Sequence, residues 1–317
     1  MAKLVRLDEI KAVVDRMDLT EAIEQGFVAY SNDQTVTPPP GELLFEDPPG
    51  DTHIKYGYMK GAATYVIKIA SGFYRNPQLG LPSSSGLMLV FSQQTGELRT
   101  LLLDDGYLTN VRTALAGRIV AKYLQPHAVA GIGVLGTGLQ ARMQVSFLQA
   151  VSDCRKVHVW GRTPEHAAAY RQAMQDQGFE VVIEESPALV AAASNLIVST
   201  TPSTVPLLAA DDIKPGTLIT AVGSDTPEKQ ELDPMILAKA DVLVADSLSQ
   251  CRERGEISKA LVAGAIAEQR VLELGDVIQD PGLAALRQDS ICVADLTGVA
   301  VQDVQIASAV CEALENL

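Results

Sequence analysis

The sequence predicts an α/β protein that joins a doubly wound parallel sheet of the Rossmann type to a smaller α+β domain. Three observations indicate this fold. The chain has 317 residues, which at about 150 residues per domain suggests two domains. In its second half, near-continuous runs of Val, Ile and Leu alternate with helical stretches, as in parallel sheets covered on both faces. In its first half, several strands follow one another without helices between them, which favours an antiparallel sheet.

The smaller domain is expected to begin with helix and to continue with strands. An apolar periodicity predicts one or two amphipathic helices from residue 7 to about residue 31. Short runs with high β-propensity then lie between glycine- and serine-rich turns, at residues 65–70, 86–91 and 101–103. These runs predict a mostly antiparallel sheet.

The larger domain is expected to follow a long helix, from Thr109 to Leu124, with Thr109 as its N-cap. The strands that we expect after it cover residues 128–135, 157–160, 180–183, 196–200, 218–222 and 242–246, and the helices cover residues 140–150, 164–177 and 187–193. A last helical pattern, residues 302–316, can pack back onto the smaller domain. We therefore place a Rossmann domain at residues 115–300 and the smaller domain at residues 1–114 with 301–317.

Composition and charge exclude several classes of function. The 39 acidic and 25 basic residues give a net charge of −14, which would repel a nucleic acid. The four cysteines lie far apart and form no C-x-x-C pair, so we expect no metal site. The chain begins without the apolar run of a signal peptide, and no stretch has the roughly 18 apolar residues of a membrane span. We expect a cytoplasmic protein that binds neither membranes nor nucleic acids.

The clearest chemical motif is the run Gly136-Thr137-Gly138-Leu139-Gln140-Ala141. It reads G-x-G-x-x-A directly after a predicted strand and at the start of a predicted helix. This arrangement suits a dinucleotide, because the helix N-terminus offers free N–H groups to the pyrophosphate. The alternatives are a glycine-rich turn without a ligand and a loop that binds S-adenosylmethionine.

The next strand ends at Arg162 and Thr163, where NAD sites usually carry Asp or Glu for the ribose 2′-hydroxyl. A guanidinium beside a hydroxyl suits a 2′-phosphate, so the pair favours NADP(H). In the alternative, Arg162 only stacks on the adenine and the site accepts either dinucleotide.

Two cations of the smaller domain are candidates for holding an anionic substrate. Lys68 lies inside an apolar strand, where a charge is costly to bury without a partner. Arg112 lies near a helix N-terminus, where the helix dipole disfavours a cation, and a bidentate bond to a carboxylate would explain it. The alternatives are a solvent-facing Lys68 and a surface Arg112 paired with Asp104 or Asp105.

The segment from Gly223 to Leu232 follows a predicted parallel strand at its carboxyl end, where open α/β sheets place their ligands. Within it, Asp225 could act as a general acid or base, and Lys229 could pair with it or with the cofactor. In the alternative, the acidic residues of this loop only cap the next helix.

Together these segments resemble the ornithine cyclodeaminase/mu-crystallin family. The resemblance covers most of the chain and rests on Lys68 and on the runs at residues 81–86, 105–114, 136–141, 223–232 and 295–303. It implies a homodimer of NAD(P)-dependent subunits, each with a Rossmann domain and with a second domain for substrate and dimer contacts.

The resemblance also implies roles for single residues. Lys68 and Arg112 would hold the α-carboxylate of the substrate, with Lys68 near the reacting carbon, and Asp225 would donate or accept the proton. The residues expected to bind the cofactor are Ser84, Arg112, Gly136, Thr137, Gly138, Leu139, Gln140, Arg162, Thr163, Lys229 and Thr297.

The chain departs from the family pattern at two places that bear on the substrate. An arginine that many members use for a carboxylate is missing from residues 38–44. The strand before Lys68 carries His53 and Lys55, whereas members that convert ornithine place an acidic residue there. Lys55 would repel an ammonium group and attract a second carboxylate, so ornithine is disfavoured.

We therefore expect an oxidoreductase that transfers hydride between NAD(P)H and a small anionic 2-imino acid. A dicarboxylic imino acid such as iminosuccinate, or a cyclic ketimine acid, fits the cations. The alternatives are a cyclodeaminase-type lyase with catalytic NAD and a non-catalytic protein that binds NADPH or another ligand, as crystallin-like members do.

Overall fold

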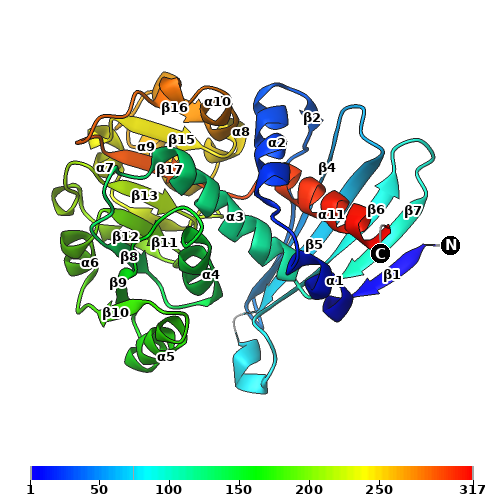
Figure 1. The fold of residues 1–317 in the computed structure, drawn as a ribbon, viewed down its shortest axis with the longest axis horizontal. Helices are drawn as coiled ribbons and strands as arrows, with labels where there is room; N and C mark the ends of the chain where they lie inside the picture. The colour runs from blue at the N-terminus through cyan, green and yellow to red at the C-terminus, as the bar shows by residue number, and fades with distance from the viewer. Residues whose placement is uncertain (1, 74, 316–317) are drawn as a thin grey trace. The chain divides into compact units, whose positions relative to one another are not determined.

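The computed structural model describes residues 2–73 and 75–315. It consists of two compact units (Figure 1). Unit 1 comprises residues 1–112 and 299–317, and unit 2 comprises residues 113–298. Within the described residues, no helix combines the length and the apolar character that a membrane crossing requires.

Unit 1 is built on a seven-stranded sheet of the order β1-β7-β6-β5-β4-β2, with β3 paired to β4. All neighbours pair antiparallel except β1 and β7, which confirms the predicted sheet. The strands are β1 (Lys3–Arg6), β2 (Thr35–Val36), β3 (Gly41–Phe45), β4 (Gly50–Met59), β5 (Thr64–Phe73), β6 (Ser84–Ser92) and β7 (Leu98–Leu103).

The C-terminal helix α11 (Ala300–Glu315) is part of unit 1. It lies along the sheet and contacts β4, β5 and β6, as Figure 1 shows. It also packs against α2 (Thr20–Ser31) and α1 (Leu7–Val14), and Phe27 and Ile306 are fully buried. A short 3₁₀ helix, η1 (Asn76–Leu79), precedes β6. The core of unit 1 is therefore completed by a helix from the C-terminal end of the chain.

Helix α3 (Tyr107–Leu124) begins earlier than predicted, and the expected Thr109 cap is wrong. Asp105 and Gly106 have positive φ angles of 51° and 79°, which turn the chain sharply after β7. Asp104 then reaches forward, and its Oδ2 accepts the Leu108 N–H at 2.8 Å. The acidic residue before the turn takes the capping role because the turn brings the first free N–H groups to it.

Unit 2 contains an eight-stranded, fully parallel sheet of the order β10-β9-β8-β11-β13-β17-β15-β16. The strand order reverses between β8 and β11, which is the switch point of a doubly wound Rossmann sheet. The strands are β8 (Ile132–Leu135), β9 (Lys156–Trp160), β10 (Glu180–Ile183), β11 (Leu196–Ser199), β13 (Leu218–Ala221), β15 (Val242–Ala245), β16 (Val271–Glu273) and β17 (Cys292–Asp295).

Every residue of β8, β11, β13, β15 and β17 is buried, which explains their unbroken apolar composition. The predicted helices are confirmed as α4 (Leu139–Leu148), α5 (Pro164–Gln175) and α6 (Pro187–Ala193). Two strands of the main sheet, β16 and β17, were not predicted from the sequence. Nor were α7 (Pro234–Lys239), α8 (Leu248–Cys251), α9 (Gly255–Val262), α10 (Leu274–Gln279), three 3₁₀ helices (Ala210–Asp212, Glu268–Arg270 and Pro281–Ala284) or the small sheet of β12 (Thr204–Leu208) and β14 (Gln230–Leu232).

Candidate active site

The glycine-rich loop lies between β8 and α4 in unit 2. Gly136 has φ +113°, and a Cβ there would come within 2.7 Å of Thr200 Oγ1, so the tight turn requires glycine. Gly138 is the N-cap of α4 and supplies no side-chain cap, and a Cβ on it would meet no atom within 4 Å. The space beside Gly138 is therefore open, and no side chain of the N-cap binds the first N–H groups of α4, which fits the pyrophosphate of a dinucleotide. Leu139 is exposed beside them, and the Gln140 side chain accepts a hydrogen bond from Gln144.

Arg162 and Thr163 follow β9 beside this loop. The backbone at Gly161 is so close to the loop that a Cβ there would lie 2.6 Å from Thr137 Cγ2. Both Arg162 and Thr163 are exposed, and Thr163 is the N-cap of α5 without using its hydroxyl as a cap. The guanidinium and the hydroxyl therefore stand at the carboxyl end of the strand next to the glycine-rich loop.

Asp225 and Lys229 lie together in the loop after β13. Lys229 Nζ is 2.5 Å from Asp225 Oδ1, and the Asp225 side chain is 49% exposed. Thr297, which follows β17 at the same end of the sheet, is buried instead. Its hydroxyl donates to Asp246 Oδ1 at 3.0 Å and accepts from Gln250 Nε2 at 2.8 Å. Both loops follow carboxyl ends of parallel strands; the strand before the Asp225 loop was predicted from the sequence, and β17 before Thr297 was not.

A buried ionic cluster occupies unit 1, and Asp303 lies at its centre. Lys68 Nζ is 3.1 Å from Asp303 Oδ2, and Arg112 Nε is 3.1 Å from Asp303 Oδ1. Arg112 Nη1 also donates to Gln302 Oε1 at 2.8 Å. Lys55 lies directly opposite Lys68 in the register of β4 and β5. We call Lys55, Lys68, Arg112, Gln302 and Asp303 the cationic cluster.

The cationic cluster is shielded from water, because none of its five residues is more than 8% exposed. A solvent-facing Lys68 and a surface Arg112 are therefore wrong, and so is the pairing of Arg112 with Asp104 or Asp105 as a surface ion pair. Lys68 and Arg112 both contact the single carboxylate of Asp303, so this group of three side chains carries more positive than negative charge. A further anion could neutralise such a buried group.

The local charges change the pKa values in this cluster. Burial lowers the pKa of Lys68 to about 8; Asp303 opposes this shift, and Arg112 adds to it. Burial alone would raise the pKa of Asp303, but Lys68, Arg112 and Lys55 together hold it below its usual range. Asp303 is therefore a carboxylate at neutral pH. Nearby, burial raises the pKa of Asp104.

Sequence reasoning assigned no role to Asp303 or Gln302. Both are 1% exposed on α11, within a run of buried apolar residues. A charged residue on the buried face of a helix was the available signal. Ser84, by contrast, is exposed at the start of β6, where it pairs in register with Gly72, four residues along β5 from Lys68.

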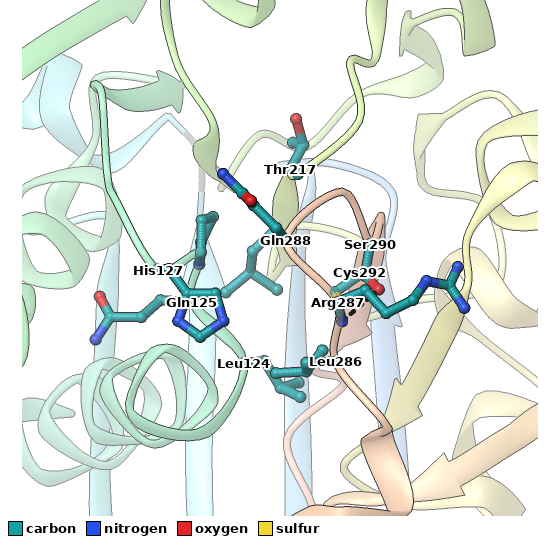
Figure 2. A pocket seen from close by; sticks show the side chains of 12 residues that line it. Leu124, Gln125, His127, Thr217, Leu286, Arg287, Gln288, Ser290 and Cys292 are labelled. Carbon is teal, nitrogen blue, oxygen red and sulfur yellow. Dashed lines mark hydrogen bonds between the residues drawn. The ribbon is translucent and has the colours of Figure 1, made fainter.

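A separate cavity of about 40 Å³ lies at the other end of the sheet in unit 2 (Figure 2). It adjoins Leu218 and Cys292, the first residues of β13 and β17, together with His127 and Gln288. Parallel sheets place their ligands at carboxyl ends, and this volume is about that of one or two water molecules. The cavity therefore plays no part in the candidate site. Among the residues that the structure describes, no three or more His, Cys, Asp or Glu side chains gather where a metal ion could bind.

Comparisons with known proteins identify the family. Residues 2–316 match the profile of the ornithine cyclodeaminase/mu-crystallin family. An uncharacterized cyclodeaminase of Sinorhizobium fredii is 38% identical over 310 residues, which is 96% of this chain and 94% of that protein. The alanine dehydrogenase of Archaeoglobus fulgidus is 33% identical over 306 residues, covering 96% and 92% of the two chains.

Two solved structures share the whole fold. An archaeal alanine dehydrogenase dimer with bound NAD superposes with a TM-score of 0.88 at 30% identity, over 100% of this chain and 97% of the other. The iminosuccinate reductase of Paracoccus denitrificans in complex with NAD⁺ has a TM-score of 0.86 at 29% identity, over 99% and 97%. The Rossmann fold predicted for unit 2 is confirmed.

Proposed function

Since the chain belongs to the ornithine cyclodeaminase/mu-crystallin family, we propose that it is an NAD(P)-dependent oxidoreductase that converts a small 2-imino acid into an amino acid. The observation that carries this proposal is the buried cationic cluster, in which Lys68 and Arg112 share the single carboxylate of Asp303 and could bind a small anion. The dinucleotide, when bound, supplies the hydride. The reductases and dehydrogenases among the relatives support this reaction class.

The cationic cluster would bind the α-carboxylate of the substrate. Arg112 offers a planar guanidinium that is already oriented by Asp303 and Gln302, so little conformational entropy is lost when it binds. Among the described residues, the buried Gln302 Nε2 donates no hydrogen bond, and a carboxylate oxygen would accept one from it. Lys68 and Gln302 would thus bind the same carboxylate as Arg112.

A second carboxylate on the substrate would use the remaining positive charge. Lys55, buried opposite Lys68 in the register of β4 and β5, would lie near that carboxylate. The positive charge of Lys55 favours a dicarboxylic imino acid of the iminosuccinate type and disfavours ornithine, whose distal ammonium would face Lys55. The similarity to the iminosuccinate reductase supports the same substrate class. A cyclic ketimine acid is the second candidate.

Asp225 would exchange the proton with the substrate nitrogen. Its carboxyl group is half-exposed and can reach a ligand, and Lys229 Nζ contacts its Oδ1. Ser84, Arg112, the loop from Gly136 to Gln140, Lys229 and Thr297 would contact the dinucleotide.

Arg162 and Thr163 favour NADP(H) over NAD(H). Both are exposed where a strand end meets the glycine-rich loop, so a 2′-phosphate could bind between them. Two solved relatives contain NAD or NAD⁺. Calorimetric titration of this protein with both dinucleotides measures its preference.

We also propose a cytoplasmic homodimer. Strand β3 exposes Leu43, Leu44 and Phe45, with Leu44 72% exposed, and this apolar strand would form the subunit contact. The archaeal relative is described as a dimer. Sedimentation of the purified protein tests this point.

The resemblance to a cyclodeaminase keeps a lyase as the second candidate function. One assay separates the candidates: the absorbance of the reduced nicotinamide is followed during incubation with 2-keto acids and ammonia or methylamine. Oxidation with a dicarboxylic keto acid supports the reductase. Product without net change of the dinucleotide supports the lyase, and binding of the dinucleotide without product supports a ligand-binding protein.

A further inference from the structure

A fully buried carboxylate, Glu231 in β14, accepts four hydrogen bonds in unit 2. Its Oε1 accepts from the backbone N–H of Thr201 at 2.6 Å and from the Thr201 hydroxyl at 2.7 Å. Its Oε2 accepts from the Ser199 hydroxyl at 2.9 Å and from the backbone N–H of Gly223 at 3.0 Å. Both oxygens are therefore satisfied by the protein, so Glu231 has no direct contact to offer a ligand.

The four donors belong to two loops at the carboxyl end of the sheet. Ser199 ends β11, and Thr201 follows it; Gly223 precedes Ser224 and Asp225 in the loop after β13. A Cβ on Gly223 would lie 2.5 Å from Glu231 Oε2, so the backbone of this loop rests directly on the carboxylate. Glu231 thus joins the loop that carries Asp225 to the loop after β11.

The loop after β11 is in turn joined to the glycine-rich loop. Thr200 donates to the Leu135 carbonyl through its N–H at 2.9 Å and through its hydroxyl at 3.2 Å. Gly136 packs against the same Thr200 side chain. Through Thr200, the contacts of Glu231 extend from the loop of Asp225 to the turn that precedes the dinucleotide-binding helix α4.

The backbone of Glu231 is itself held in place by a second buried glutamate. The buried Glu256 of α9 accepts the backbone N–H of Glu231 at 2.8 Å and that of Leu232 at 3.0 Å. Burial raises the pKa of Glu231 to about 7, while the hydrogen bonds from Thr201 and Ser199 favour its ionised form. Burying a carboxylate costs free energy, and Glu231 has no oxygen left for a ligand. Its burial therefore needs a structural reason.

We propose that Glu231 is a positioning residue that holds Asp225 at a defined distance from the dinucleotide. This inference rests on the proposed function, because it gives Asp225 the proton transfer. A displacement of about 1 Å in a reacting group is enough to lower turnover strongly. Glu231 would therefore act on kcat through Asp225, and not through the affinity for the dinucleotide.

Glu231→Gln tests the carboxylate without changing its size. Each oxygen of Glu231 accepts one backbone N–H, which cannot turn away as a hydroxyl can. An amide in either orientation sets its NH₂ group against the N–H of Thr201 or of Gly223. The Gly223 loop must then shift.

The experiment is a double-mutant cycle on the full-length protein. We expect Glu231→Gln to lower kcat at least about tenfold and to change the KM for the dinucleotide less than about twofold. In an Asp225→Asn background, the same substitution should lower kcat by less than about twofold, because residues that act as a unit are not additive. Equal effects of Glu231→Gln in the two backgrounds would overturn the proposal.

Asp241→Asn is the matched control. Asp241 also accepts a backbone N–H, from Ile291 at 2.9 Å, but it lies at the amino ends of the strands. We expect its kcat to stay near that of the wild type. If Glu231→Gln does not fold, Ser199→Ala replaces it in the cycle, because this substitution removes only one donor to Glu231 Oε2. We expect Ser199→Ala to lower kcat by a smaller factor, and this loss should again disappear in the Asp225→Asn background. A loss that persists there contradicts the proposal.

Hydrogen exchange provides a readout that does not depend on activity. We expect amides at residues 221–230 to exchange faster in Glu231→Gln than in the wild type or in Asp241→Asn. Unchanged exchange would overturn the positioning role. Absence of turnover in the wild type, by contrast, would refute the proposed function. The hydrogen-exchange rates would then still show whether Glu231 holds the loop of residues 221–230 in place.

Discussion

Lys68 Nζ lies 3.1 Å from Asp303 Oδ2, with both side chains almost completely buried. Asp303 also contacts Arg112 at 3.1 Å, so one carboxylate orients two cations of unit 1. The carboxylate that holds Lys68 and Arg112 in place therefore comes from the protein, and these two cations share its single negative charge.

Replacing the central carboxylate should destabilise the protein. Asp303→Asn keeps the shape of the side chain but leaves Lys68 and Arg112 buried without their counter-charge, which should cost about 3–5 kcal/mol of unfolding free energy. Thermal and denaturant unfolding measure this loss. The matched control is Glu268→Gln, which breaks the exposed ion pair with Arg252 and should leave unfolding near the wild type. Equal effects of the two substitutions would contradict the structural role of Asp303.

The affinity for the imino acid should fall at alkaline pH. The pKa of Lys68 is lowered to about 8, so Lys68 is protonated below this pH and loses its charge as the pH rises through it. The KM for the substrate should therefore rise above about pH 8, while the KM for the dinucleotide stays flat. Lys68→Arg keeps the charge at high pH and should move the rise to higher pH. An unchanged pH profile in Lys68→Arg would assign the titration to another group.

The preference for NADP(H) should depend on Arg162. Arg162→Ala should weaken binding of NADPH by about 1.5–3 kcal/mol, because a charge-assisted hydrogen bond to the 2′-phosphate is lost, and should leave NADH nearly unchanged. Calorimetric titration with the two dinucleotides measures both effects. Arg287→Ala, at the cavity on the opposite end of the sheet, is the control. Equal losses for NADPH and NADH would reject the 2′-phosphate site.

Selection for a second carboxylate should depend on Lys55. Lys55→Met keeps the length of the apolar stem but removes the charge, and it should raise the KM for a dicarboxylic imino acid about tenfold or more. A monocarboxylic imino acid should be affected much less, since Arg112 and Lys68 remain. The ratio of kcat/KM for the two substrates is the measurement. If kcat/KM falls by the same factor for both substrates, Lys55 has only a structural role.

Turnover should depend on the carboxyl group of Asp225. Asp225→Asn keeps the size of the side chain but cannot exchange a proton, so kcat should fall about 10²–10⁴-fold. The dissociation constant of the dinucleotide should stay within about twofold, because the glycine-rich loop is unaltered. Lys229 Nζ is 2.5 Å from Asp225 Oδ1, so the comparison variant Lys229→Met leaves the Asp225 carboxyl group in place and removes its partner, together with a proposed contact to the dinucleotide. A normal kcat in Asp225→Asn would remove its assigned role.

Much of the fold was predictable because its signals are local. The buried strands of unit 2 are unbroken apolar runs, and the run from Gly136 to Ala141 follows one of them directly. Short elements escaped prediction for the opposite reason. Helix α9 and strand β14 carry buried glutamates, Glu256 and Glu231, that interrupt the apolar pattern. Their carboxylates are satisfied by backbone N–H groups, which a linear pattern does not reveal.

The sequence by itself determined the parallel sheet, the glycine-rich loop, and Lys68 and Arg112 as candidate cations, because each depends on neighbours within a few residues. Only the tertiary structure decided what these cations contact. Asp303 is 191 residues from Arg112 along the chain and reaches it because α11 returns to the sheet of unit 1. The charge of a buried site is the sum over side chains that folding brings together, and chain separation carries no information about that sum.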